Sequence, residues 1–210
     1  MSAVKMMDDI LAQRRSTRAF DGRELEPEKI EKLIEAGRLA PFAGIAQKDT
    51  DAFRHFFVIH RDSAQAEKIK RLCEAGRQAE VLRIQAEHLD EKYPETAKTI
   101  QAISQKPADD LFMSPWLIII AERGALPQRE EICLGYVLEN MWLKATEMEV
   151  AFKICSGISD IHDKEALKEV LGLRDQETYA FDACSVGYPK HPFQERPEHV
   201  KPVKSVTYFR

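Results

Sequence analysis

The chain has 210 residues, of which 44% are hydrophobic and 31% are charged, a balance typical of a folded globular domain and far from that of a disordered chain. It has 31 lysine and arginine residues and 35 aspartate and glutamate residues, and the resulting formal net charge of -4 argues against general nucleic-acid binding. The length fits a single domain over residues 1–210 that is large enough to bury a core.

The ends of the chain and its cysteines point to a cytoplasmic protein without a membrane partner. The opening stretch MSAVKMMDDILAQ carries acids where a secretory signal would have an apolar core. The longest aliphatic run, LIIIA at 117–121, is far too short to cross a bilayer. The cysteines form no CxxC pair, so we expect free thiols in a reducing compartment. The six histidines show no ligand spacing, so no metal site is predicted.

Hydrophobic periodicity and breaker residues predict helices interleaved with strands. Helices are expected, in chain order, at 4–13, from Pro27 to Pro41, from 62 to about 90, between Pro94 and Pro107, from Pro127 to Met148, and at 163–173. Strands are expected at 53–60, 114–122, 150–157 and 178–189. Two helices come first and the tail is extended, which favours an α+β fold, a mixed sheet covered by helices, over a doubly wound one. We expect 62–108 to be a peripheral helical excursion and 190–210 an extended C-terminal arm.

A cationic cluster, RRSTRAF at 14–20, is the first candidate site. Guanidinium groups match phosphate oxygens bidentately and a serine hydroxyl adds a neutral donor, so Arg14, Arg15, Ser16 and Arg18 can form a phosphate site. The alternative is a solvated basic turn after a helix, which charge alone favours. The sequence has no GxGxxG, GxxxxGK[ST] or GxSxG motif. We therefore expect a cofactor to supply the reactive group of any enzyme.

Five stretches in order resemble the FMN-dependent nitroreductase family, over nearly the whole chain: RRSTRAF, AGRLAPFAGIAQ, SPWLIIIAE, LENMWLKATEMEVAFKICSGI and SVGYPKHPFQERP. The resemblance implies a homodimer with FMN at the subunit interface. It places Arg14 and Ser16 near the flavin phosphate and ribityl hydroxyls, with Arg15 assisting at the phosphate. It places Arg18 at the pyrimidine edge, where a cation stabilises the anionic reduced flavin.

The same resemblance assigns further cofactor-binding residues. Cys155, Ser156 and Gly157 fall where the family's backbone amides meet the flavin ring, and Arg196 matches a phosphate arginine in the tail. Pro41, Phe42 and Gln47 lie in the stretch where the family has APS-x-x-N-x-QPW. Phe42 replaces the serine, Ile45 replaces the asparagine, and Pro-Trp is missing, so this side of the pocket is more apolar. We expect an altered substrate and weaker FMN binding.

The resemblance implies an FMN-dependent oxidoreductase that passes hydride from NADH or NADPH to a small, aromatic acceptor such as a nitro compound or quinone. No side chain need act as a dedicated acid or base, because the flavin carries the chemistry. Two alternatives stay open: a non-catalytic flavin- or ligand-binding dimer of the same fold, and a helical interaction protein that uses 62–108. Dimerisation is expected through the apolar helix around Met141 and Trp142, with the tail near Val203–Phe209 embracing the partner.

Overall fold

A four-stranded sheet lies at the centre of this computed structural model, which describes residues 7–42, 53–193 and 207–208. The strands, in the spatial order β1-β2-β4-β3, are β1 (Arg54–His60), β2 (Trp116–Arg123), β4 (Tyr179–Gly187) and β3 (Ala151–Ile154). All three neighbouring pairs are antiparallel. Ser16 adds a parallel bridge to Phe152. The predicted α+β class is therefore confirmed, and within the described residues the parallel part of the sheet is that one bridge.

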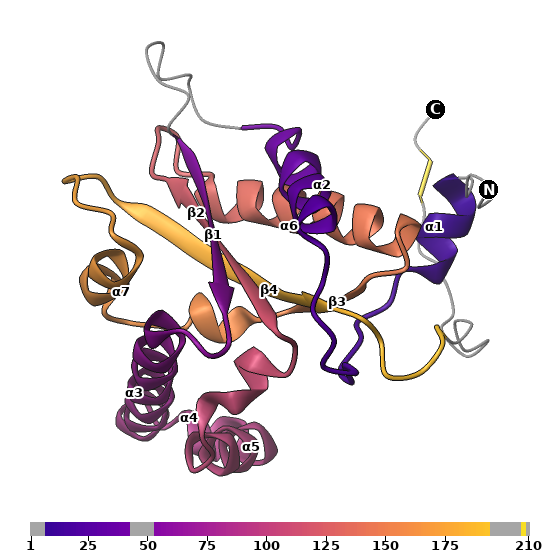
Figure 1. The fold of residues 1–210 in the computed structure, drawn as a ribbon. Coiled ribbons are helices and arrows are strands. Elements are labelled where there is room, and N and C mark those ends of the chain that lie inside the picture. Colours follow the sequence, from indigo (N-terminus) through magenta and orange to yellow (C-terminus); the bar gives the residue numbers. More distant parts are fainter. Residues whose placement is uncertain (1–6, 43–52, 194–206, 209–210) are drawn as a thin grey trace.

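Two helices cover one face of the sheet, and a shorter one lies at its end (Figure 1). They are α2 (Pro27–Arg38) and α6 (Glu130–Glu147), with α1 (Met7–Gln13) packed against α6. Pro27 occupies the first turn of α2, where its missing N–H is no loss. At Gly37 the packing is close: an added Cβ would lie 2.9 Å from Phe56 Cε1 and 3.1 Å from Met141 Cγ.

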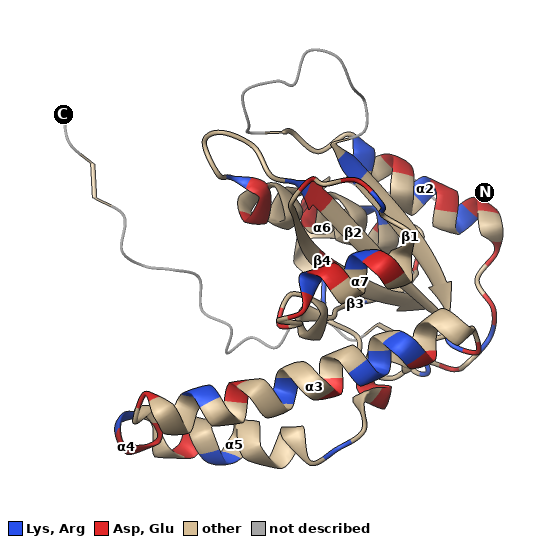
Figure 2. Cartoon of the chain, turned by 90° about the vertical axis from the view of Figure 1, so that its left-hand side faces the viewer, with Lys and Arg blue, Asp and Glu red and all other residues tan. Residues whose placement is uncertain are grey.

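The opposite face carries the remaining helical elements: α3 (Ala64–Ala86), α4 (Leu89–Lys92), α5 (Pro94–Ser104), η1 (Ala108–Phe112), η2 (Ser156–Ile158) and α7 (Lys164–Leu171). The Ser63 hydroxyl caps α3 by accepting from the Ala66 amide at 3.2 Å. Gly172 ends α7 in a left-handed conformation at φ 76°. Figure 2 shows α3 and α5 side by side, extending away from the sheet and joined at their far end through α4.

The core has two parts because successive β2 residues point to opposite faces. Leu117, Ile119 and Ala121 pack on the α3 side, whereas Ile118 and Ile120 pack on the α2–α6 side. All five are fully buried, as expected for a strand whose apolar run is continuous.

Some predicted boundaries are wrong. The long apolar helix begins at Glu130 and not at Pro127, which lies in the preceding loop. The strand predicted at 150–157 ends at Ile154, and η2 follows from Ser156.

The four cysteines are free, as predicted. Over residues 7–42 and 53–193, no helix has the length and apolar character needed to cross a membrane.

Candidate functional site

The arginine segment 14–20 is anchored through its backbone. After α1 ends, the Thr17 amide donates to the Phe152 carbonyl at 2.9 Å, beside the bridge from Ser16 to Phe152. At the other end of the segment, the Lys190 amide donates to the Ala19 carbonyl at 3.0 Å. The segment therefore runs between β3 and the chain that follows β4.

Most of the predicted phosphate-binding residues surround one cavity of about 310 Å³. Its lining combines the arginine segment with the chain after β4: Arg15, Ser16, Thr17, Arg18, Ala19, His191, Pro192 and Phe193. Arginine, serine and threonine are residue types whose side chains can bind a phosphate group. Sequence reasoning missed the contribution of His191, Pro192 and Phe193, since nothing in their types marks them as neighbours of residue 16.

Arg14 is engaged differently from the other two arginines. Its guanidinium carbon lies 4.3 Å from the centre of the Trp142 ring, and its Nε lies 3.1 Å from Glu139 Oε1. The Trp142 indole N–H donates to the Arg15 carbonyl at 3.1 Å. These α6 side chains hold the start of the segment, and Arg14 does not line the 310 Å³ cavity. Helical periodicity could place Trp142 on α6 but could not place it beneath Arg14.

β3 is bridged to the arginine segment at Phe152, and residues 155–157 follow directly after its end at Ile154. The Cys155 amide donates to the Ala183 carbonyl at 2.8 Å, and its side chain is buried. Burial raises the pKa of the Cys155 thiol, although a hydrogen bond with Ser185 opposes that effect. The thiol points inward, so a ligand here would meet the backbone.

Ser156 and Gly157 open η2, where the first amides have no acceptor inside the turn. An added Cβ at Gly157 would lie 3.5 Å from Leu111 Cδ2, an ordinary contact. The backbone of this segment can therefore be approached, and it carries donors that are not used by the turn.

Pro41 and Phe42 are held at a different place. Arg54 donates to the Gly37 and Ala40 carbonyls at 3.0 Å and to the Pro41 carbonyl at 3.3 Å. Figure 1 shows the end of α2 well apart from the start of β3. In one chain the arginine segment bridges β3 at Phe152 and residues 155–157 follow the end of β3, whereas 41–42 lie apart from both.

Two predicted residues, Gln47 and Arg196, lie outside the described residues, as does Ile45.

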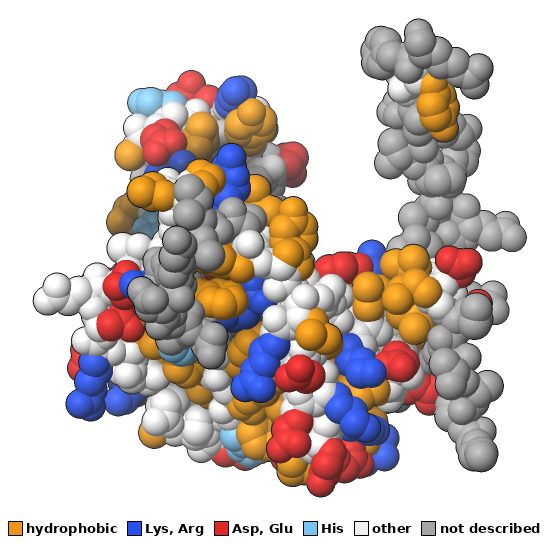
Figure 3. All heavy atoms as spheres, turned by 90° about the horizontal axis from the view of Figure 1, so that it is seen from above, with side chains coloured by type: hydrophobic (Ala, Val, Ile, Leu, Met, Phe, Trp, Pro, Cys, Tyr) orange, Lys and Arg blue, Asp and Glu red, His pale blue; other side chains and the backbone are white. Residues whose placement is uncertain are grey.

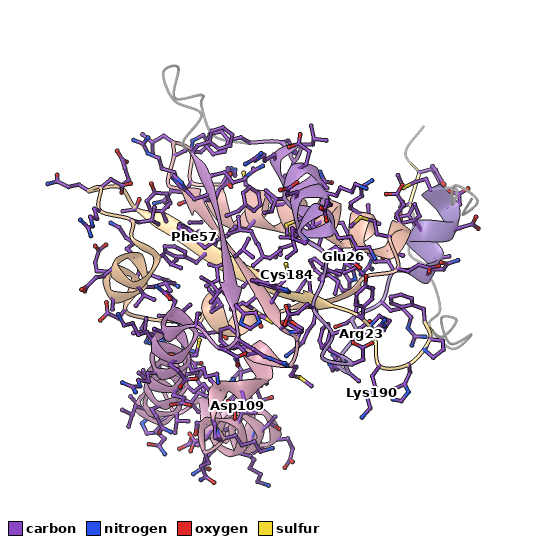
Figure 4. All side chains as sticks on the ribbon, in the orientation of Figure 1. Arg23, Glu26, Phe57, Asp109, Cys184 and Lys190 are labelled. Carbon is purple, nitrogen blue, oxygen red and sulfur yellow. The ribbon has the colours of Figure 1, made fainter. Side chains whose placement is uncertain are left out.

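A second, larger cavity of about 830 Å³ adjoins the first and shares His191, Pro192 and Phe193 with it. Arg23 and Lys190, labelled in Figure 4, also line this cavity. The Arg23 guanidinium carbon lies 4.4 Å from the centre of the Tyr188 ring. Sequence reasoning did not select Arg23 or Tyr188.

Comparisons with solved structures show the same fold over the whole chain. A nitroreductase with bound FMN from Bacteroides fragilis is 17% identical, with a TM-score of 0.68, covering 98% of this chain and 100% of its own. A BluB-like flavoprotein from Clostridium difficile 630 is 19% identical, with a TM-score of 0.70, covering 98% and 99%. A putative NADH oxidase from Clostridium acetobutylicum is 21% identical, with a TM-score of 0.55, covering 94% and 100%.

No curated protein matches the chain. The family model described as the nitroreductase family, in contrast, matches residues 11–188. That range contains the arginine segment, the whole sheet and the 155–157 turn. The chain therefore belongs to the nitroreductase family.

Proposed function

We propose that this protein is an FMN-dependent oxidoreductase that takes hydride from NADH or NADPH and reduces a small aromatic acceptor, such as a nitro compound or a quinone. The observation that carries the proposal is the pairing of the arginine segment with β3. This pairing aligns a cavity with phosphate-binding donors and the accessible backbone of 155–157 along one strand. A phosphorylated ligand with a flat ring needs both features.

The residues at this place fit an FMN group. Arg15 and Ser16 would bind the phosphate, with Arg18 placed to stabilise negative charge on the ring. The backbone of Ser156 and Gly157 would meet the ring edge. When bound, the flavin would supply hydride and electron transfer, and the protein would supply position and electrostatics. The FMN in the Bacteroides fragilis relative supports this cofactor.

The donor is proposed on two grounds. A nicotinamide that stacks on a flavin needs no separate dinucleotide-binding motif, which agrees with the lack of a GxGxxG sequence. The Clostridium acetobutylicum relative is named as a putative NADH oxidase.

We also propose a cytoplasmic location. The free cysteines support it, because free thiols are typical of a reducing compartment.

We further propose a homodimer whose two flavin sites each use both subunits. Pro41 and Phe42 lie apart from the rest of the candidate site in one chain, so a partner subunit would have to supply them. The side of the molecule in Figure 3 presents hydrophobic side chains among charged ones. On α6, Ile132 and Tyr136 are 48% and 45% exposed and lie one turn apart.

The dimerisation face expected from the sequence needs correction at one residue. Met141 is fully buried between α6 and the rest of the subunit, so it is not available to a partner. Tyr136→Lys should therefore yield a monomer in analytical ultracentrifugation. Leu82→Lys, at a more exposed apolar position on α3, is the control and should leave the mass unchanged. A monomeric wild-type protein with FMN bound would contradict the dimer proposal.

FMN binding and its reduction form the main test. FMN is titrated into the protein while flavin fluorescence is followed, and the complex is then mixed anaerobically with NADH or NADPH. We expect bound FMN to lose its visible absorption and to regain it when a quinone or nitroarene is added. Arg18→Ala should weaken FMN binding by roughly tenfold to a hundredfold, since a hydrogen bond to a charged group contributes about 1.5–3 kcal/mol.

Arg83→Ala is the matched control for Arg18→Ala. Arg83 is a half-exposed arginine on α3 that pairs with Glu80 and Glu87, so its loss should leave the FMN dissociation constant unchanged. If wild-type protein bound no FMN, or if both variants bound it equally well, the site assignment would be wrong.

A second candidate function is a non-catalytic flavin-binding dimer. Phe42 favours it, because its ring packs 4.5 Å from Phe53 where the family's serine would offer a hydroxyl. This candidate predicts FMN that binds but keeps its absorption after NADH and NADPH are added. Rapid bleaching of the bound flavin would exclude it.

A further inference from the structure

The buried thiol of Cys73 and the buried hydroxyl of Ser185 contact the 155–157 turn, whose own Cys155 thiol is also buried. Ser185 on β4 donates its hydroxyl hydrogen to the Leu111 carbonyl in η1, at 2.6 Å. Cys155 Sγ lies 3.0 Å from the same Ser185 oxygen. Because a serine hydroxyl has one hydrogen, which is already donated, Ser185 is the acceptor toward the Cys155 thiol, which also lies 3.6 Å from the Lys153 carbonyl oxygen. The bonds therefore form a directed chain from Cys155 through Ser185 to Leu111.

The other end of the turn is held from a different helix. Cys73 on α3 directs its thiol to the Gly157 carbonyl, with Sγ and oxygen 3.3 Å apart. Cys73 and Cys155 are 2% and 3% exposed. Burial raises the pKa of Cys73 to about 12 and also raises that of Cys155. Both thiols consequently keep their hydrogens at neutral pH and can act as donors.

These contacts fix the turn at two points that lie two residues apart. The side chain of Cys155 is bound to β4 and η1, and the carbonyl of Gly157 is bound to α3. Leu111 lies under the same turn, 3.5 Å from the position that a Gly157 Cβ would take. Ser156 lies between the two fixed points and is exposed. Its orientation therefore depends on both sets of bonds.

We propose that Cys73, Cys155 and Ser185 are positioning residues that set the orientation of the Ser156–Gly157 backbone against the flavin ring, and thereby its reduction potential. This inference rests on the proposed function. The physical basis is that backbone dipoles beside a redox ring stabilise its oxidised and reduced forms unequally. A small tilt of those dipoles therefore changes the free-energy difference between the oxidised and the reduced flavin. A purely structural role would change stability and leave the potential unchanged.

The test uses the full-length protein loaded with FMN, and it measures the flavin midpoint potential by equilibration with a reference dye. Cys73→Ala removes the donor to Gly157, and Ser185→Ala removes the link between Cys155 and Leu111. Each should change the ratio of affinities for oxidised and reduced FMN by about threefold to tenfold. A tenfold change corresponds to about 30 mV for a two-electron couple. Cys73→Ser keeps a hydrogen-bond donor and should restore most of the wild-type potential.

Cys184→Ala is the matched control. Cys184 is the neighbour of Ser185 on β4, is fully buried, and faces the opposite side of the sheet, near its centre in Figure 4. Its loss should lower the unfolding temperature without moving the potential. Equal shifts in Cys184→Ala and Cys73→Ala, or no shift in any variant, would overturn the positioning role while leaving FMN binding intact. Failure of wild-type protein to bind FMN would instead overturn the proposed function, and this inference with it.

Discussion

The polar groups buried beside the end of α2 and those buried beside the 155–157 turn differ in charge. On the α2–α6 face, Arg54 and Glu122 stand directly opposite each other on β1 and β2 as a charged pair. Their side chains are 3% and 0% exposed, and two bonds of 2.6 and 2.9 Å join them. On the α3 face, the buried polar groups around Cys155 and Ser185 are uncharged.

This difference follows from the cost of burial. A buried charge needs a partner in fixed geometry, so the Arg54–Glu122 pair locks the end of α2 at Ala40 and Pro41. Thiols and hydroxyls cost much less to bury and form weaker bonds. The turn at 155–157 is consequently held by contacts that single substitutions can adjust. The charged pair holds the segment after α2, at Ala40 and Pro41, whereas the more weakly held segment is the 155–157 turn, where the flavin ring is proposed to bind.

The largest expected effect comes from breaking the charged pair. Arg54→Met should lower the free energy of unfolding by about 3–5 kcal/mol, because it leaves Glu122 buried without its cation. Burial already raises the pKa of Glu122 against the opposing effect of Arg54. Urea denaturation measures the loss. The double variant Arg54→Met/Glu122→Leu should recover most of it, and an equal loss in both variants would contradict this interpretation.

A half-buried carboxyl on β4, Asp182, extends the comparison. Asp182 on β4 accepts from the Ala183 amide at 2.7 Å, and this bond and the nearby Lys164 both act to lower the pKa of the carboxyl. Burial, with a smaller contribution from Asp160, raises the pKa of Asp182 from 3.8 to about 6. Between pH 4 and 6 the folded protein keeps a proton that the unfolded chain has lost. The contribution of Asp182 to the free energy of unfolding therefore falls as pH rises through that window.

Asp182→Asn removes this dependence. The variant should gain stability relative to wild type as the pH rises from 4 to 7, reaching a difference of about 2 kcal/mol, since each pKa unit corresponds to about 1.4 kcal/mol. Urea denaturation at pH 4, 5, 6 and 7 measures the difference. A constant difference across that range would show that Asp182 does not titrate as expected.

The smallest effect compares one glycine on each face. An added Cβ at Gly76 of α3 would lie 2.9 Å from the Asp160 carbonyl oxygen, which is backbone, whereas at Gly37 of α2 it would meet side-chain atoms of Phe56. A side chain can shift more easily than backbone, and alanine favours a helix over glycine by about 1 kcal/mol. We expect Gly76→Ala to destabilise by about 1–2 kcal/mol and Gly37→Ala to remain within about 1 kcal/mol of wild type. Thermal unfolding of both variants measures these changes in stability. A larger loss of stability in Gly37→Ala than in Gly76→Ala would contradict the distinction between side-chain and backbone neighbours.

The sequence by itself determined the fold class and most elements. The continuous apolar run at 117–121 identified a strand buried on both faces, and Pro27 and Gly172 marked one helix start and one helix end. These features are local, so residue type and spacing are sufficient to read them. Resemblance to a family, and not periodicity, selected the 155–157 segment.

Only the tertiary structure decided which side chains meet. It placed Trp142 beneath Arg14, Cys73 beneath Gly157, and Arg54 opposite Glu122, pairs whose members lie 68 or more residues apart in the chain. It also showed that α6 starts at Glu130 and not at the predicted Pro127. Such contacts depend on strand register and helix packing, and both are fixed by the burial of whole faces and not by any short motif.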